Sequence, residues 1–491
     1  MEVYFIPKEA SPIGLHPLRE IWEASVGPAI VGYLDSKGVK WTSLDPVRIG
    51  YAESDSSPPA IVWMGVVPGT LSAEDGIEVA THCKSILSAH GVNDTHVEIR
   101  ESEVFHSAGP KMYKPIFASN AAVEAREPFS TSLGLPICAE ATPSIGGTGG
   151  FFISDPRHPG KIYLVTARHV VFHPDTEPNM LYQHGNSSQS RRNVLLFSDD
   201  AFEEHLKAIE SLIDDQIFLI DYLERRLRHA EQLNESEAKS EKKQVPFLLE
   251  QAKKALGALE EFLVDVSGNW KKQENRILGY VALSPPIGLN VGEEGFTEDW
   301  AVIEIDRSKV DLTNFVGNVI DLGTTIPVGT FWSWMDPHRT KPRAFDYPVD
   351  RLLKFCGMIS DEEMWKPSPN TLDRENVPVI LVIKRGYATG LTVGRLNTIR
   401  SFTRVYVKDQ PGQVSKEIAV LPRNSTSGAF STPGDSGSAV IDGKGRLAGL
   451  LTGGSGSTEE SDFSYITSIH FLCKRMLEHG IKANLSPSLN A

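Results

Sequence analysis

Short apolar runs, separated by stretches that contain glycine, proline and serine, dominate the chain from about residue 130 onward. Examples are 146–153, 162–167 and 447–451. Apolar runs of this length, separated by turn-forming residues, are typical of an all-β barrel or sandwich. We therefore predict a mainly β protein over this region, closed by a helix over 466–477.

The stretch 199–272 follows a different period, in which apolar residues step by three and four. This spacing predicts two helices with heptad seams that pack as an antiparallel helical hairpin, a coiled-coil insertion. The polar stretch 234–244 joins them, and Pro246 suits the start of the second helix. Gln216 occupies a seam position, where a polar side chain can set the register. The apolar seam residues are Phe202, Leu206, Ile209, Ile213, Ile220, Leu223, Leu227 and Ala230, then Leu249, Ala252, Leu256, Leu259, Leu263 and Val266.

Residues 1–127 have the pattern of a separate α/β module. Strands are predicted over 47–51, 60–67 and 95–100, and a helix over 72–90 with Ser72 as its N-cap. The order is ββαβ. Nothing in this module has the spacing of a catalytic group, so we expect it to be regulatory or a pro-segment.

Composition and charge narrow the class of protein. The 491 residues suffice for two or three domains, and the net charge of −14 argues against nucleic-acid binding. No run approaches the roughly 18 apolar residues of a membrane-spanning helix. Residues 1–9 lack the basic lead and the apolar core of a secretory signal. The chain is therefore expected to be cytoplasmic, with no membrane span.

The spacing of the cysteines also favours a cytoplasmic location. Cys83, Cys138, Cys356 and Cys473 are scattered, with no CxxC spacing. This spacing argues against a zinc site and against a disulfide framework, and fits a reducing environment. No metal and no cofactor is expected.

The most reactive-looking stretch is Gly434-Asp435-Ser436-Gly437. Glycine tolerates backbone angles that other residues avoid, so such a turn can make a serine hydroxyl project from the main chain. Nearby N–H groups can then point at one place. Acyl transfer needs both features, a nucleophile and preformed donors for the developing oxyanion.

An activated serine also needs a base whose second nitrogen is held by an acid. His169 follows an apolar strand and Asp299 begins one. The order His, Asp, Ser separates this arrangement from those of subtilisin and the α/β-hydrolases. His173 is a weaker candidate for the base because it stands in a loop before Pro174, and the acidic pair 214–215 is better placed on the solvated face of the hairpin.

Four motifs together carry a family resemblance. They are Thr166-Ala167-Arg168-His169, Asp299-Trp300-Ala301-Val302, Gly434-Asp435-Ser436-Gly437-Ser438 and the glycine-rich 447–456. With them the chain resembles the chymotrypsin/trypsin-like serine peptidases, particularly intracellular fungal-type members without the family's usual disulfides. The resemblance covers roughly residues 130–480. It implies two six-stranded antiparallel β-barrels, one over 128–310 that contains the hairpin at 199–272, and one over 311–491 that ends in a helix.

The resemblance also implies a role for each residue of the motifs. Ser436 would be the nucleophile, His169 the general base and Asp299 the acid that orients it. The N–H groups of Gly434 and Ser436 would form the oxyanion hole. The residues implied in substrate binding are Phe430 at the base of the first pocket, Thr452, Gly453 and Gly454 along the substrate backbone, and Ser464 in the pocket wall. Phe430 supplies no carboxylate, so an uncharged residue is expected before the cut.

The chain departs from the family at several positions. Val170 and Thr432 stand where extracellular members carry cysteines, in agreement with a cytosolic location. The family's Arg-Ile-Val-Gly-Gly activation site is missing near residue 130. In the family, cleavage at that site frees an N-terminus that pairs with the residue corresponding to Asp435. The missing site implies that Asp435 does not receive such an N-terminus.

Three functional hypotheses follow. The first is an intracellular serine endopeptidase acting by limited proteolysis on a protein or peptide substrate, with regulatory proteins binding the hairpin or the N-terminal module. The second is a catalytically silent adaptor that binds partners through the hairpin. The third adds that the N-terminal module is a pro-segment removed by self-cleavage near Arg126-Glu127 or within 128–136.

Overall fold

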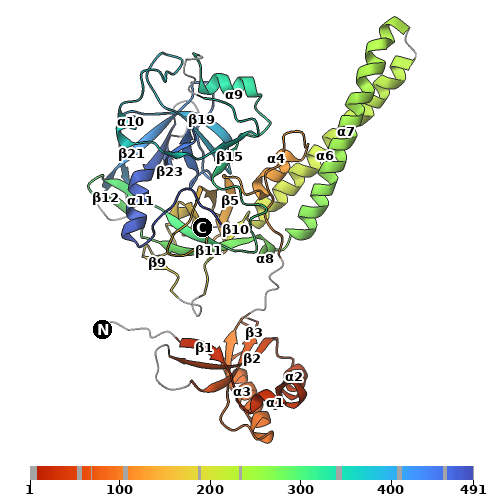
Figure 1. Ribbon diagram of the computed structural model, residues 1–491, viewed down its shortest axis with the longest axis vertical. Helices are drawn as coiled ribbons and strands as arrows, with labels where there is room; N and C mark the ends of the chain where they lie inside the picture. The colour runs from red at the N-terminus through yellow and green to blue at the C-terminus, as the bar shows by residue number, and fades with distance from the viewer. Residues whose placement is uncertain are drawn as a thin grey trace. The chain divides into compact units, whose positions relative to one another are not determined.

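The computed structural model divides the chain into two units, Met1–Ser107 and Ala108–Ala491 (Figure 1). The structure describes residues 8–51, 58–67, 69–102, 109–185, 190–231, 235–338, 345–405, 412–456 and 462–489. Residues 1–7, on which the secretory-signal argument largely rests, lie outside this range. Among the described residues, no helix is both long and apolar enough to cross a lipid bilayer.

The first unit is a four-stranded sheet in the order β1-β2-β3-β4. Strand β3 runs parallel to β4 because helix α3 carries the chain back between them. The helix predicted from Ser72 is present, and Ser72 Oγ accepts a hydrogen bond from the N–H of Asp75 at 3.1 Å. The elements are β1 (Lys8–Pro12), α1 (Leu18–Ile21), η1 (Trp22–Val26), α2 (Gly27–Ser36), β2 (Trp41–Tyr51), β3 (Ala60–Val66), α3 (Ala73–Ala89) and β4 (His96–Glu101). Strand β1 and the helices before β2 were not predicted.

The boundary between the units lies at Ser107, earlier than the position near 127 that the pattern indicated. Residues 109–127 belong with the second unit by their contacts. The N–H of Met112 donates to Lys309 O at 3.0 Å, and the N–H of Tyr113 donates to Phe129 O at 2.8 Å. Few of these residues lie in regular elements, so periodicity alone could not assign them.

The second unit is mainly β and contains several sheets. One follows the order β6-β5-β10-β11-β14-β8-β7, with β9 beside β11. Its two end strands, β6 and β7, are consecutive in the chain, so this sheet nearly closes on itself. Its strands are β5 (Leu135–Ala139), β6 (Gly146–Gly149), β7 (Phe151–Ile153), β8 (Tyr163–Thr166), β9 (Tyr182–Gln183), β10 (Asn193–Leu196), β11 (Ile277–Ser284) and β14 (Ala301–Ile305).

The larger sheet contains a closed cycle of antiparallel pairings, β18-β19-β21-β24-β23-β22 and back to β18. Its strands are β12 (Gly288–Val291), β13 (Phe296–Glu298), β17 (Gly357–Met358), β18 (Leu381–Gly386), β19 (Gly390–Leu396), β20 (Ser401–Val405), β21 (Gln413–Pro422), β22 (Ala439–Asp442), β23 (Arg446–Ser455) and β24 (Phe463–Ser468). Strands β15 (Val319–Asp321) and β16 (Leu352–Lys354) form a separate pair. The short helices are α4 (Val123–Arg126), η2 (Glu127–Phe129), α5 (Arg168–Val171), α8 (Gln273–Arg276), α9 (Val328–Met335), α10 (Asp361–Trp365) and α11 (Ile469–Glu478).

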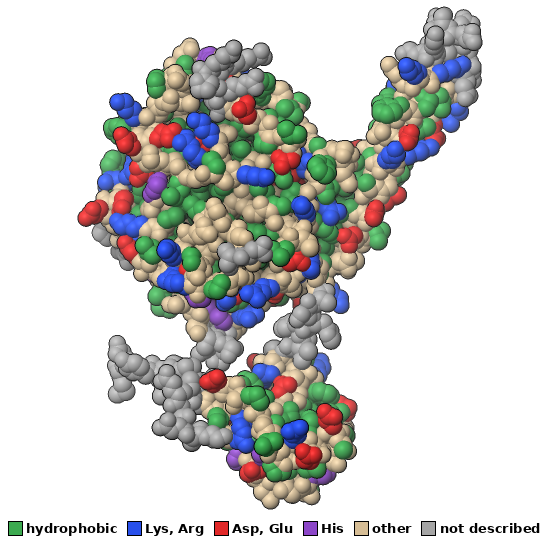
Figure 2. Space-filling model, in the orientation of Figure 1, with side chains coloured by type: hydrophobic (Ala, Val, Ile, Leu, Met, Phe, Trp, Pro, Cys, Tyr) green, Lys and Arg blue, Asp and Glu red, His purple; other side chains and the backbone are tan. Residues whose placement is uncertain are grey.

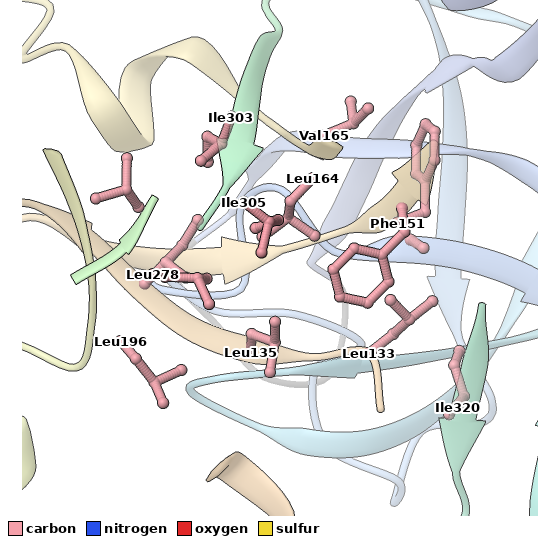
Figure 3. Packing of buried hydrophobic residues seen from close by; sticks show 14 of the residues in the cluster. Leu133, Leu135, Phe151, Leu164, Val165, Leu196, Leu278, Ile303, Ile305 and Ile320 are labelled. Atoms are coloured by element: carbon pink, nitrogen blue, oxygen red, sulfur yellow. The ribbon is translucent and has the colours of Figure 1, made fainter. Parts of the chain in front are cut away.

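The interior of the nearly closed sheet is packed with branched aliphatic and aromatic side chains (Figure 3). Leu135 from β5, Leu164 from β8 and Ile303 from β14 are each at most 1% exposed. Full burial of such a side chain contributes about 1.5–3 kcal/mol to stability. This core fixes the ends of β8 and β14, where the candidate catalytic residues lie.

Two long helices, α6 (Asp199–Glu231) and α7 (Glu235–Asn269), pack against each other and project from the second unit (Figure 1). At their base, Phe202 and Val266 join the main core, and further out Leu223 packs with Ala252. Helix α7 begins at Glu235, so the expected start near Pro246 is wrong. Pro246 is exposed, and a carbonyl that loses its N–H partner to proline can bind water on that face.

Candidate active site

The pairing of β8 with β14 brings His169 and Asp299 together. Thr166, the last residue of β8, lies opposite Ala301, the first residue of β14. Antiparallel strands place the end of one beside the beginning of the other. His169 follows in the short helix α5, and Asp299 directly precedes β14. Residues far apart in the chain therefore meet where these two paired strands end and begin.

Asp299 contacts His169 at two points. Asp299 Oδ2 lies 2.6 Å from His169 Nδ1, and Oδ1 accepts a hydrogen bond from the N–H of His169 at 3.1 Å. The Asp299 side chain is 7% exposed and the His169 side chain 25% exposed. The carboxylate is therefore enclosed while part of the imidazole reaches solvent. Because Nδ1 faces the carboxylate, Nε2 is the nitrogen left for a substrate or nucleophile.

The pair shifts both pKa values toward the charged forms. Burial acts to lower the pKa of His169, but the charge of Asp299 and its hydrogen bond outweigh burial and raise it. Burial acts to raise the pKa of Asp299. The charge of His169 and the hydrogen bonds to the carboxylate outweigh burial and hold this pKa below its ordinary value. An imidazole with a raised pKa is a stronger base, as proton abstraction from a hydroxyl requires.

The turn that carries Ser436 packs closely against the end of β8. Gly437 has φ +90°, and a Cβ there would overlap Thr148 O and Thr166 Oγ1 and lie 3.2 Å from Ala167 N. Gly434 has φ +101°. Only glycine fits both demands at Gly437, a left-handed backbone and a close approach. Ser436 therefore lies one residue from a backbone contact with the segment that bears His169.

Thr148, in β6, joins this turn to the nearly closed sheet. Its N–H donates to Ser436 O at 2.8 Å, and its Oγ1 donates to Gly434 O at 3.0 Å. Thr148 is itself held, because its carbonyl accepts from Thr166 Oγ1 and its Oγ1 accepts from the N–H of Tyr387. Thr148 is fully buried. The carbonyls of Gly434 and Ser436 are thus directed into the protein, which turns the backbone of the turn in a defined way.

The predicted oxyanion donors are unused within the described part of the chain. There, no hydrogen bond has the N–H of Gly434 or of Ser436 as its donor, and none joins Ser436 Oγ to His169. Catalytic hydrogen bonds are often long before substrate binds and tighten in the complex. The turn therefore presents a half-buried serine and two main-chain donors that are not used within the described residues.

The predicted substrate-binding residues lie around the same turn. Thr452, Gly453 and Gly454 are on β23, and the N–H of Gly437 donates to Leu451 O at 2.7 Å, beside Thr452. Ser464 pairs with Gly454 across β23 and β24. Its assignment to a pocket wall, like the cleavage preference, stays a prediction.

Phe430 is buried, unlike Thr452, Gly453 and Gly454. It is 1% exposed and packs against Gly394, where a Cβ would overlap its ring. The next residue, Ser431, places Oγ 2.6 Å from Ser464 Oγ. The role of Phe430 as the base of a substrate pocket stays a prediction.

The weaker candidates lie elsewhere. His173 Nδ1 accepts a hydrogen bond from the N–H of Asp175 at 3.2 Å, which makes it a loop-stabilising residue. Asp214 and Asp215 are exposed on α6.

Sequence reasoning missed three buried charged residues around this site. Arg168, 2% exposed, donates to Ser284 O and Met180 O and so braces α5. Glu417 accepts from the N–H of Thr297, and burial raises the pKa of its carboxyl to about 7. Lys384 directly follows the apolar run 379–383 and lies within β18. A lysine that continues an apolar strand was the signal that could have identified it.

The sequence matches no family model and no curated protein sequence. Solved structures that are similar to this chain include serine proteases. A glutamic acid-specific serine protease is 11% identical, covers 72% of this chain and 100% of its own, and has a TM-score of 0.33. Protease A of Thermobifida fusca is 10% identical over 72% of this chain and 98% of its own, with a TM-score of 0.30. A Nocardiopsis protease is 11% identical over 70% and 96%, with a TM-score of 0.29.

Proposed function

We propose that this protein is a serine endopeptidase with Ser436 as nucleophile, His169 as general base and Asp299 as the residue that orients the base. The observation that carries the proposal is the double contact of Asp299 with His169 beside the glycine-bounded turn of Ser436. A buried carboxylate, a partly exposed imidazole and a serine next to unused N–H donors are the parts that acyl transfer requires.

The chemistry follows from these positions. Ser436 Oγ attacks the carbonyl carbon of the scissile peptide bond while His169 Nε2 takes its proton. The carbonyl electron pair moves to oxygen, and the N–H groups of Gly434 and Ser436 stabilise the resulting oxyanion. When the C–N bond breaks, His169 returns the proton to the leaving amine. Water then attacks the acyl-enzyme by the same route, which releases the acid and restores Ser436.

The arrangement of strands supports a chymotrypsin-like assignment of the second unit. The nearly closed sheet supplies His169 and Asp299, and the cycle β18-β19-β21-β24-β23-β22 supplies the Ser436 turn, between β21 and β22. We propose that these are the two barrels of that fold, with α6 and α7 inserted in the first. A cleft between two barrels lets each hold part of the constellation rigidly.

A fluorophosphonate probe tests the proposal, because it reacts covalently with activated serines. We expect the wild-type chain to be labelled at Ser436 and the Ser436→Ala variant to remain unlabelled. Ser333→Ala is the matched control: Ser333 is exposed on α9 and its hydroxyl donates to the Thr330 carbonyl, so labelling should be unchanged. Equal labelling of wild type and Ser436→Ala would disprove the assignment. Digestion of a peptide library by the same samples then reads the preferred residue before the cut.

The hairpin favours a second role in partner binding. Apolar side chains on its surface are exposed, including Phe218 at 69% and Phe247 at 61% (Figure 2). A regulatory protein bound there is compatible with catalysis, whereas a purely adaptor function predicts no labelling of the wild type. The probe experiment therefore separates the two alternatives.

A further inference from the structure

Lys384 and Asp435 form an ion pair that has no contact with solvent. Lys384 Nζ, from β18, lies 3.1 Å from Asp435 Oδ2, and both side chains are 0% exposed. Asp435 lies between Gly434 and Ser436, the two residues proposed as oxyanion donors. Burying a charge is costly unless the charge is paired and hydrogen-bonded. The pair therefore joins strand β18 to the centre of the turn.

The carboxylate of Asp435 is fully engaged by the turn and by the loop after β18. Its Oδ1 accepts from the N–H groups of Ala388 and Thr389, at 3.0 and 3.1 Å. Its Oδ2 accepts from the N–H of Thr432 at 3.0 Å and from Thr389 Oγ1 at 2.7 Å. Lys384 Nζ also donates to Thr389 Oγ1 and, at 3.3 Å, to Gly390 O. One network thus fixes the Ser436 turn to its neighbouring loop.

We propose that Lys384 is a positioning residue for the oxyanion hole, acting through Asp435. Its ammonium holds the carboxylate inward and so fixes the backbone of Asp435. The peptide plane after Asp435 carries the N–H of Ser436, and the backbone of Gly434, with its own N–H, directly precedes it. Without the cation, the carboxylate is a buried unpaired charge that gains by rotating toward water. That rotation misdirects the donors, and losing one such donor typically costs about 100- to 1,000-fold in kcat. The inference rests on the proposed peptidase function.

The cation comes from the interior of a strand, so no chain end has to be supplied by cleavage. The stretch before β5, a candidate region under the self-cleavage hypothesis, is buried in part: Phe129 is 0% and Leu133 1% exposed. Glu127, 8% exposed, is held by Arg385, whose Nε lies 2.9 Å from Glu127 Oε1. Lys384 and Arg385 are neighbours on β18. Strand β18 therefore binds the segment before β5 through Arg385 and the Ser436 turn through Lys384.

This arrangement makes catalysis sensitive to alkaline pH. Burial lowers the pKa of Lys384 to about 8, against the opposing charge and hydrogen bond of Asp435, and the nearby Arg385 lowers it further. Asp435 and Arg385 are the charged groups that act on it. The ammonium is present below this pKa and is lost as pH rises through it. Arginine stays protonated far above that range, so Lys384→Arg keeps the charge.

Steady-state kinetics and probe labelling of the full-length chain test the proposal. In Lys384→Met, we expect kcat and the rate of Ser436 labelling to fall about 100-fold or more while KM changes far less. In Lys384→Arg, the charge is retained, so kcat should recover most of the loss and the alkaline limb of the pH profile should move upward. Lys474→Met is the matched control, because its exposed ion pair with Glu294 lies on α11, outside this network.

The outcomes discriminate between the two proposals. A wild type that is not labelled at all disproves the peptidase function itself. A labelled wild type accompanied by a folded Lys384→Met with unchanged kcat, or by a Lys384→Arg whose alkaline limb does not move, overturns the role of Lys384. If Lys384→Met fails to fold, the doubly neutral Lys384→Met/Asp435→Asn variant removes the unpaired charge. Its kcat should stay low, and full activity in that variant would overturn the proposal.

Discussion

Asp299 holds His169 by both its ring and its main chain, through Oδ2 at 2.6 Å from Nδ1 and Oδ1 at 3.1 Å from the backbone nitrogen. A single bond to the ring would leave the imidazole free to swing about that bond. The second bond fixes the start of α5 against the same carboxylate, so the ring plane and the backbone move together. Asp299 therefore controls both the tautomer and the direction of Nε2.

Asp299→Asn tests this control. The amide can still accept from the main chain, but its NH₂ group facing Nδ1 favours the tautomer with a proton on Nε2, which cannot act as a base. We expect kcat to fall about 10,000-fold, as for such substitutions in Ser-His-Asp triads, with an unchanged fold. The measurement is kcat on a peptide identified by library digestion, with circular dichroism as the check on folding.

The matched control is Asp214→Asn, which makes the same chemical change on the exposed face of α6. Its kcat should equal that of the wild type. If Asp299→Asn retained wild-type activity, Asp299 would not be the orienting acid.

The acidic limb of the pH profile is a second consequence of the pair. In the proposed mechanism only neutral His169 takes a proton from Ser436, so activity should be lost as pH falls through the pKa of His169. Burial alone would lower this pKa, but the Asp299 charge and hydrogen bond raise it. We therefore expect the limb of kcat/KM to lie above the ordinary imidazole value of about 6.5. In Asp299→Asn the raising charge is gone, and the limb should move to lower pH.

Glu417 provides the control for that measurement. Burial raises the pKa of its carboxyl to about 7, with the Asp299 charge acting in the same direction, so it titrates in the same range. Glu417→Gln should leave the limb in place if His169 is responsible. A limb that disappeared in Glu417→Gln would assign the ionisation to Glu417 instead.

Local patterns in the sequence were sufficient for part of this picture. The three-and-four spacing over 199–272 predicted helices, because a helical seam repeats within one segment. His169 and Asp299 could be nominated because each adjoins an apolar strand, and the glycines around Ser436 implied an unusual turn. Each of these signals is contained in a few consecutive residues.

The features that were not predicted depend on contacts between distant segments. Residues 109–127 join the second unit through scattered backbone bonds, such as that of Met112 to Lys309. The partner of Asp435 could not be named, because Lys384 lies on another strand and only the closed cycle of pairings brings it under the turn. Thr148 acts through its position against Ser436 rather than through any motif of its own.

Thr148 gives the third prediction, because its hydroxyl and N–H hold the carbonyls on both sides of the Ser436 turn. Thr148→Val keeps the shape and the N–H but removes the hydroxyl, leaving Gly434 O and the N–H of Tyr387 without their partner. Burying an unpaired polar group costs about 1–3 kcal/mol, which the turn can relieve by rotating the Gly434 carbonyl. That rotation displaces the Asp435 end of the turn, so we expect kcat to fall about tenfold or more with little change in KM. Thr148→Ser retains the hydroxyl and should keep most of the activity. Equal kcat values for the valine and serine variants, measured on the same peptide and normalised to active sites by probe titration, would show that the Thr148 hydroxyl does not shape the oxyanion hole.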